Sequence, residues 1–391
     1  MLRKTRLFTP GPTPILPAAQ SAMASFGMHH RTAEFRALYT KFLADLKTFV
    51  GTKNDVMVLA SSGTGAMEAA VSNLTSPGDH VIVVTAGKFG ERWTGLAKAY
   101  GCNVDVVDAP YGKTVKAQDV AARVNNDTRV VYMQATESST GARHDVQAIA
   151  KAIHGKNSNT LFVVDAITGL GTTTFDVDGW GIDMLIGGSQ KAVMIPPGLA
   201  YVAVSERAWQ AMESAKSPRY YFDLRKERKS AAKGESAFTP ATSLIAAFAA
   251  ALDYIASQAA GDLAKGREAL IANAETAAAM TRAAATALGL ELFSAESPAA
   301  ALTAISAPKG IDSGVLVKAL REQFGAVVAN GQGEMKGQMI RIAHLGYYDY
   351  LDTIAIIGAL EHVLAGIALP KHSELGAGLK AAQIVYAKGR A

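Results

Sequence analysis

One acid and one amine in the middle of the chain have the types and spacing for shared chemistry. Asp165 ends a short apolar run, residues 161–164, and Lys191 closely follows a second such run, residues 184–186. Runs that are short, wholly apolar and rich in β-formers are typical of buried parallel strands. A lysine amine condenses with an aldehyde, and a carboxylate tunes a cofactor through its ring nitrogen. The pair therefore predicts a Schiff-base site for a pyridine cofactor.

A loop of small residues offers a site for an anion. The first clear strand, residues 56–60, runs into Ser62-Gly63-Thr64-Gly65, which opens a helix. Backbone N–H groups in such a loop can point at a phosphate, and the helix N-terminus adds positive potential. The loop has neither the Gly-Lys-Ser/Thr of a Walker loop nor the Gly-x-Gly-x-x-Gly of a dinucleotide site. An ordinary strand-to-helix turn favours the same residues, so the loop alone is a weak signal.

The elements that must position these groups alternate between strand and helix. This alternation predicts an α/β fold whose mainly parallel sheet carries helices on both faces. Ligands of such sheets bind beyond the carboxyl ends of the strands. The Ser-Gly-Thr loop, residues 136–141, Asp165 and Gln190-Lys191 all fall at predicted strand ends, and this convergence is stronger than any single motif. The seven expected strands are residues 56–60, 80–84, 104–107, 129–133, 161–164, 184–186 and 200–204.

The chain divides into an N-terminal arm, residues 1–17, a large domain, residues 18–260, and a small C-terminal domain, residues 261–391. Prolines in the arm make residues 9–14 extended, and proline content alone favours a plain tail. The small domain reads as an α+β unit behind a long Ala-rich helix, about residues 263–288. Its expected elements are strands 302–306, 326–329 and 339–343 and helices 315–324 and 353–364.

Two further segments are expected at the surface. Residues 218–235 are polar and charged and read as a long excursion, with Tyr220-Tyr221 suited to a subunit contact. The tail after Pro370 is expected to be peripheral.

Composition limits the class of protein. Of 391 residues 49% are hydrophobic, which allows a large core, and the net charge of +5 comes from scattered Lys and Arg. A nucleic-acid site would need these cations clustered on one face. Cys102 is the only cysteine, which excludes a disulfide within the chain and favours a reducing compartment. Residues 1–8 contain no apolar signal region and no run approaches a membrane span, so we expect a soluble cytoplasmic protein. The pair His29-His30 lacks the spacing of a metal site.

Several motifs occur in order along the chain: Pro10-Gly11-Pro12, Ser62-Gly63-Thr64-Gly65, Glu137-Ser138-Ser139-Thr140-Gly141, Asp165, Gly188-Ser189-Gln190-Lys191, Thr239-Pro240 and Arg341. Together they resemble the class V pyridoxal-phosphate aminotransferases of fold type I, most closely the alanine–glyoxylate, serine–glyoxylate and serine–pyruvate group. The resemblance covers about residues 5 to 365. It implies a pyridoxal 5'-phosphate cofactor and a homodimer with active sites at the subunit interface, and it moves the arm next to the site.

The resemblance implies a role for each matching residue on the cofactor. Lys191 would hold the cofactor aldehyde as a Schiff base and shuttle a proton, while Asp165 would face the pyridine nitrogen. Phe89 stands where relatives often place a tryptophan stacked on the ring, and Ser138 would lie near the ring hydroxyl. The residues expected to bind the phosphate are Ser62, Gly63, Thr64, Gln190 and, from the partner subunit, Thr239.

The resemblance also implies a substrate side. Arg341 would clamp the substrate carboxylate, because its planar fork donates two parallel hydrogen bonds. It lies in an apolar strand, where alternation could equally turn it to solvent. Gly11 and Arg31 would line the same side of the site.

The expected activity is amino transfer from a small amino acid, alanine or serine, to a small 2-oxo acid such as glyoxylate or pyruvate. A phosphoserine aminotransferase is a close alternative, because His30-Arg31 could meet a substrate phosphate. A lyase such as a cysteine desulfurase needs a reactive thiol on a mobile loop, and Cys102 precedes a predicted strand instead. A non-catalytic partner subunit is the third alternative, and the presence of both Lys191 and Asp165 speaks against it.

Overall fold

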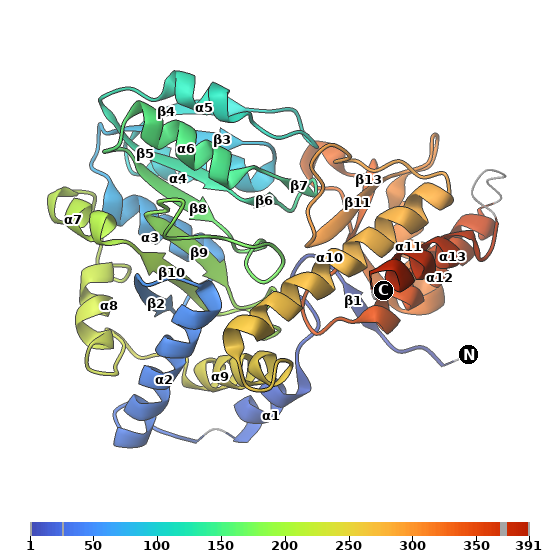
Figure 1. The fold of residues 1–391 in the computed structure, drawn as a ribbon, viewed down its shortest axis with the longest axis horizontal. Helices are drawn as coiled ribbons and strands as arrows, with labels where there is room; N and C mark the ends of the chain where they lie inside the picture. Colours follow the sequence, from blue (N-terminus) through green and yellow to red (C-terminus); the bar gives the residue numbers. More distant parts are fainter. Residues whose placement is uncertain (1, 26, 368–373, 390–391) are drawn as a thin grey trace.

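The computed structural model describes residues 2–25, 27–367 and 374–389. A large body built on one sheet carries the middle of the chain, and the C-terminal part forms a smaller body beside it, with the long helix α10 (Leu263–Ala287) running between them (Figure 1). Within the described residues, no helix is both long enough and apolar enough to cross a membrane.

The large sheet has the predicted seven strands, in the order β2-β10-β9-β8-β5-β3-β4. Neighbours are parallel except that β10 runs antiparallel to both β2 and β9. The prediction of a mainly parallel seven-stranded sheet is therefore confirmed. The strands are β2 (Asp55–Leu59), β3 (His80–Thr85), β4 (Asn103–Asp108), β5 (Thr128–Gln134), β8 (Leu161–Asp165), β9 (Met184–Gly188) and β10 (Ala200–Val204).

Helices cover both faces of this sheet, which explains why its strands read as continuous apolar runs. Phe162 and Val164 of β8 point into one core cluster, and Leu161 and Val163 point into the other. The first cluster is closed by α2 (Ala33–Val50), α5 (Ala117–Arg123), α6 (Val146–Lys156) and α9 (Thr242–Ser257), and the second by α3 (Gly63–Leu74), α4 (Lys88–Ala99), α7 (Glu206–Ser214) and α8 (Leu224–Ala231).

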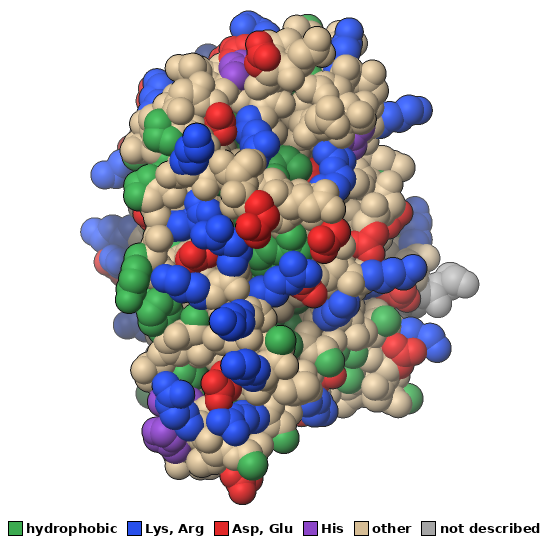
Figure 2. All heavy atoms as spheres, turned by 90° about the vertical axis from the view of Figure 1, so that its left-hand side faces the viewer, with side chains coloured by type: hydrophobic (Ala, Val, Ile, Leu, Met, Phe, Trp, Pro, Cys, Tyr) green, Lys and Arg blue, Asp and Glu red, His purple; other side chains and the backbone are tan. Residues whose placement is uncertain are grey.

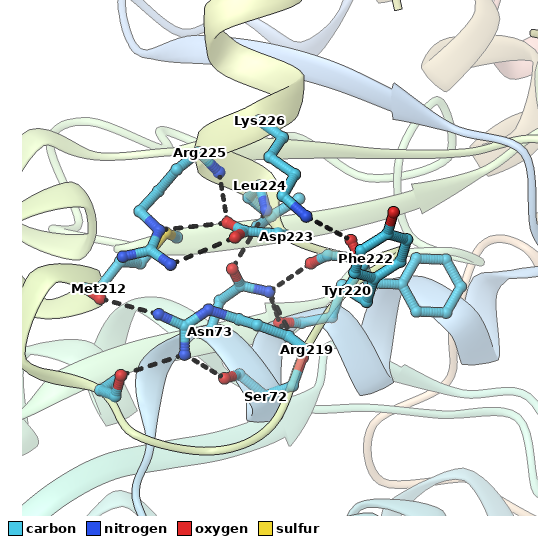
Figure 3. Close-up of polar contacts among 12 residues, drawn as sticks. Ser72, Asn73, Met212, Arg219, Tyr220, Phe222, Asp223, Leu224, Arg225 and Lys226 are labelled. Atoms are coloured by element: carbon cyan, nitrogen blue, oxygen red, sulfur yellow. Dashed lines mark hydrogen bonds and ion pairs between the residues drawn. The ribbon is translucent and has the colours of Figure 1, made fainter. Parts of the chain in front are cut away.

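The expected surface excursion at residues 218–235 contains a helix, α8, and is tied to the end of α3 (Figure 3). Asn73 donates to the Phe222 carbonyl at 2.6 Å and accepts from the Leu224 N–H at 3.1 Å. The Arg219 guanidinium donates to backbone carbonyls, including that of Ser72 at 3.1 Å. The excursion is thus an anchored segment and not a loose one.

Charged side chains of both signs are spread over the face that carries α7 and α8 (Figure 2). Arg228 on α8, for example, lies 2.8 Å from the Asp55 carboxylate and 3.5 Å from that of Glu206. On this face the cations are interspersed with acids, as the scattered sequence positions predicted.

The small sheet includes one strand that the sequence did not predict. Its order is β1-β12-β13-β11, and β1 (Arg6–Phe8) pairs parallel to β12 (Ala326–Asn330). The N-terminal arm is therefore not a plain tail, because its first part is an edge strand of the C-terminal body. The other elements match the expected α+β unit: β11 (Leu302–Ser306), α11 (Ser313–Phe324), β13 (Met339–Ala343) and α12 (Tyr350–Gly366).

The remaining elements are short or peripheral. In the predicted tail, α13 (Ala377–Lys388) packs along α10 and α12, whereas residues 370–373 and 390–391 lie outside the described residues. The other elements are α1 (Pro17–Ser25), β6 (Thr136–Glu137), β7 (Ala142–Arg143) and the short helix η1 (Gly333–Met335).

Candidate active site

Asp165 and Lys191 meet at the carboxyl edge of the large sheet. Asp165 is the last residue of β8, and Lys191 follows the end of the neighbouring β9. Both side chains are buried, with 5% and 8% of their surface exposed. The Asp165 carboxylate accepts the Ile167 N–H at 2.8 Å through Oδ1, and Oδ2 has no hydrogen-bond partner among the described residues. Each side chain shifts the pKa of the other toward its charged form, although the two form no direct ion pair.

Burial shifts both groups toward their neutral forms. Burial raises the pKa of Asp165 to about 6, and the nearby Glu137 carboxylate acts in the same direction, while the Ile167 N–H, Lys191 and Arg92 oppose it. Burial lowers the pKa of Lys191 to about 8; Asp165 opposes this, and Arg341 and Arg92 add to it. A lysine with a lowered pKa has an accessible neutral amine near neutral pH, which is the form that attacks a carbonyl.

The N-terminal arm lies directly over Lys191. The Lys191 amine donates to the Pro10 carbonyl, and the Thr13 hydroxyl donates to the Lys191 carbonyl at 3.0 Å. Gly11 has φ +144°, and a Cβ added there would stand 2.7 Å from Lys191 Nζ. The arm can approach this closely only because residue 11 has no side chain.

The Ser-Gly-Thr loop lies near the end of β9, although β10 stands between β2 and β9 in the sheet. Ser62 is the N-cap of α3 and its hydroxyl makes no capping bond. A Cβ at Gly63 would stand 2.3 Å from Ile167 Cδ1, and one at Gly188 would stand 3.1 Å from Ile167 Cγ2. The Ile167 side chain, just after β8, therefore packs against both the Ser-Gly-Thr loop and the end of β9. The side-chain oxygen of Gln190 is buried without a partner. The uncapped Ser62 hydroxyl and the unpartnered Gln190 oxygen both lie at this end of the sheet.

Arg92 joins the site, although the sequence analysis did not single it out. Its guanidinium donates to the Thr64 hydroxyl at 2.9 Å and lies 4.9 Å from the centre of the Phe89 ring. Three residues along a helix bring two side chains onto one face, so the spacing from Phe89 could have revealed it.

Arg341 is buried in β13, with 4% of its surface exposed, so the solvent-facing alternative is wrong. Its guanidinium donates to the Asn330 carbonyl at 2.7 and 3.1 Å and to the Ser138 carbonyl at 2.7 Å. Burial lowers its pKa to about 10, and the charge of Glu137 opposes that shift. Backbone carbonyls fix the guanidinium plane and leave its other N–H groups available.

Two candidate residues, Thr239 and Arg31, make no bond with Asp165 or Lys191 of the same chain in the part that the structure describes. Thr239 is exposed in the loop before α9, and Arg31 is exposed between α1 and α2. Among the described residues, neither forms a hydrogen bond or ion pair with Asp165 or Lys191. Thr239 was expected to act from the partner subunit, and the roles of both residues stay predictions.

Comparison with known proteins identifies the family. A profile of the family Aminotransferase class-V matches residues 13–345. The chain is 39% identical to a protein named soluble hydrogenase, small subunit, from Synechococcus sp., with 98% of this chain and 99% of that one covered. It is 33% identical to an L-aspartate–glyoxylate aminotransferase from Paracoccus denitrificans, with 99% and 97% covered.

A solved structure agrees with the sequence matches. The fold matches an aspartate aminotransferase of subgroup IV from Thermus thermophilus with TM-score 0.86 and 35% identity, over 93% of this chain and 99% of that one. The chain belongs to the class V aminotransferases. It is therefore a transaminase of fold type I, a family that typically uses pyridoxal phosphate, and the resemblance noted in the sequence is confirmed.

Proposed function

We propose that the protein transfers the amino group of a small amino acid, alanine or serine, to glyoxylate or pyruvate, with pyridoxal 5'-phosphate as cofactor. The single observation that carries the proposal is the buried pair of Asp165 and Lys191, with Arg341 nearby on the small body. The names of relatives support the acceptor, because one is an L-aspartate–glyoxylate aminotransferase.

The residues present fit the cofactor. The N–H groups of Gly63 and Thr64, the first two of α3, have no hydrogen-bond partner among the described residues and suit a phosphate. The Ser62 hydroxyl makes no capping bond at the same end of the sheet, and the NH2 group of Gln190 would donate to the phosphate. Arg92, through Thr64, adds positive charge there. The unpaired Oδ2 of Asp165 suits a protonated ring nitrogen, and Ser138 and Phe89 would complete the pocket around the ring.

The strength of the Asp165 interaction can be compared with the cost of its burial. Raising the pKa of Asp165 from 3.8 to about 6 corresponds to about 3 kcal/mol. A contact with a cationic ring at ~4 Å and an effective dielectric of ~20 is worth about 4 kcal/mol. Ring binding would therefore offset the cost of burying the charge and keep Asp165 ionised below pH 6 as well. When bound, the cofactor supplies an electron-poor ring that absorbs the charge released as the substrate α-C–H bond breaks.

The chain's own residues would do the remaining work. Lys191 Nζ would accept the α-proton and return it, a task that suits an amine whose pKa is about 8. Arg341 would hold the substrate carboxylate in its plane, which orients the α-C–H bond for transfer. The arm at Gly11 would restrict the substrate side and exclude water.

Several observations bear on other amino donors and on other activities. Arg92 places a second cation near Lys191, which favours aspartate as the second candidate donor, in agreement with two of the similar proteins. A desulfurase is disfavoured because Cys102 is buried at the amino end of β4, where burial raises the pKa of its thiol. His30 and Arg31 form no hydrogen bond or ion pair with Lys191 within the described chain, so the phosphoserine alternative is left to the half-reactions described below.

We also propose a homodimer whose contact includes residues 218–240. Tyr220 and Tyr221 are 74% and 47% exposed there, and the ring of Phe238 stacks on Tyr221 at 5.0 Å. Because Thr239 follows Phe238, this surface would bring Thr239 to the partner's site. Sedimentation of the purified protein tests the dimer.

Half-reactions test the activity directly. The cofactor-loaded protein is mixed with alanine, serine, aspartate or phosphoserine, and conversion of the cofactor to its amine form is followed by absorbance. We expect conversion by alanine or serine and recovery by glyoxylate or pyruvate. Conversion by aspartate or phosphoserine alone would replace the proposed donor. No conversion by any donor would contradict transamination and support a non-catalytic subunit.

A further inference from the structure

Glu137 is a wholly buried acid that binds no substrate or cofactor in the proposal above. It ends β6, and none of its surface is exposed. Its carboxylate accepts the N–H groups of Phe89 and Gly90 at 3.1 Å each, through Oε2. Oε1 accepts the N–H of Ser139 at 3.1 Å and its hydroxyl at 2.5 Å. Both oxygens are therefore fully engaged, as a buried carboxylate requires.

These bonds replace the cap that α4 lacks. Its N-cap is Gly87, which has no side chain to accept the free N–H groups of the first turn. Glu137 accepts two of them, and the Ser139 hydroxyl accepts the N–H of Lys88 at 3.1 Å. The negative charge also stands at the positive end of the helix. The position of Phe89, the second residue of α4, thus depends on Glu137.

Glu137 is also connected to the small body, through the next residue in the chain. The carbonyl of Ser138, the next residue, accepts from Arg341 at 2.7 Å. The Glu137 charge also acts on Arg341 directly, since it favours the charged guanidinium. Glu137 therefore acts on both Phe89, which would face the ring, and Arg341, which would clamp the substrate.

We propose that Glu137 is a positioning residue that fixes Phe89 and Arg341 in one arrangement on either side of the reacting groups. This inference rests on the proposed function. It predicts that loss of the carboxylate disturbs substrate binding and the cofactor environment, beyond any loss of fold stability. Nothing in the sequence pattern alone assigns this role, because Glu137 lies far from Phe89 and Arg341 along the chain.

The test compares Glu137→Gln with a matched control, Glu361→Gln. Glu361 is also buried, at 2% exposed, and accepts two backbone N–H groups, those of Gly376 and Leu379, at 2.9 Å each. It belongs to α12 and accepts from the start of α13, away from Lys191. Glutamine keeps the shape of glutamate but turns an NH2 group toward N–H donors. Both variants are expected to lose thermal stability.

The two variants should differ at the site. For Glu137→Gln we expect the KM for the amino donor to rise at least about tenfold, as for loss of a charged hydrogen bond, and the visible circular dichroism of the bound cofactor to change. Glu361→Gln should leave both as in the wild type. Ser139→Ala, which removes only the bridging hydroxyl, should move both readouts in the same direction by less, and it serves if Glu137→Gln does not fold.

The outcomes separate the two proposals. If the wild type binds the cofactor and transaminates, but Glu137→Gln and Ser139→Ala match Glu361→Gln in KM and circular dichroism, Glu137 has no positioning role. If the wild type gives no cofactor absorbance that depends on Lys191, the proposed function fails and the positioning role fails with it.

Discussion

The amine of Lys191 donates a hydrogen bond to the carbonyl of Pro10, so the N-terminal arm holds the residue that follows β9. The same arm pairs with the small sheet through β1 and bonds to the Gln190 carbonyl through Thr13. The small sheet and the Lys191 loop are thus connected through residues 6–13. A change in the arm should therefore act at the site.

Gly11→Ala tests this connection. The added Cβ would stand 2.7 Å from Lys191 Nζ on a backbone with φ +144°, which alanine rarely adopts. We expect at least about a tenfold loss of kcat/KM and a free energy of unfolding lower by about 1–3 kcal/mol. The control is Gly95→Ala, because a Cβ on that α4 glycine meets nothing within 4 Å. Equal activity for both variants would show that the arm does not constrain Lys191.

Asp165→Asn separates stability from function. The folded-state pKa of Asp165 is raised to about 6 from 3.8, so keeping the carboxylate charged costs stability above pH 6 and costs nothing below about pH 4. The cofactor-free variant should therefore be more stable than the wild type at pH 7, by up to about 3 kcal/mol, and this advantage should vanish as the pH falls below 4. Its turnover should drop by about a hundredfold or more, because a neutral amide cannot pair with a cationic ring. Thermal melts across pH check the first claim, and a variant less stable at pH 7 would refute it.

Arg341→Lys tests the substrate clamp. Lysine keeps the charge but loses the planar fork, so we expect the KM for the amino donor to rise by about ten- to a hundredfold. Arg267→Lys on α10 is the control, because the Arg267 guanidinium also donates only to backbone carbonyls, those of Thr48 and Phe49, outside the proposed subunit contact. A KM unchanged in both variants would remove Arg341 from the substrate site.

Arg92→Ala tests the charge at the phosphate end. The variant loses the bond to the Thr64 hydroxyl and the contact with the Phe89 ring, so cofactor dissociation should become about tenfold faster. If dissociation is unchanged but the KM for aspartate alone rises, Arg92 instead recognises a second substrate carboxylate. Dialysis followed by absorbance measures the first, and steady-state kinetics measures the second.

The large sheet was predictable because its strands are apolar on both faces and end in polar or glycine-rich loops. That pattern also located Asp165, Lys191 and the Ser62 loop, since parallel strands bring their carboxyl ends to one edge. Strand β1 was missed because three residues, Arg6 to Phe8, carry too short a pattern. Helix α8 was missed because its polar sequence buries only Leu224 and Glu227.

The missed parts of the site depend on contacts distant in sequence. Glu137 appeared only inside a motif, and its partners Phe89 and Gly90 come from another strand-to-helix connection. The burial of Arg341 depends on the Asn330 and Ser138 carbonyls, which alternation along β13 does not encode. The role of Thr239, expected from the partner subunit, and the role of Arg31 on the substrate side stay predictions.

The most direct test of the central claim is to trap the cofactor covalently on the protein. The cofactor-loaded wild type is reduced with borohydride and digested, and the labelled peptide is identified by mass spectrometry. The account predicts one pyridoxyl group, on Lys191, and no label at that position in Lys191→Ala. A label on a different lysine, or full transamination by Lys191→Ala, would contradict it.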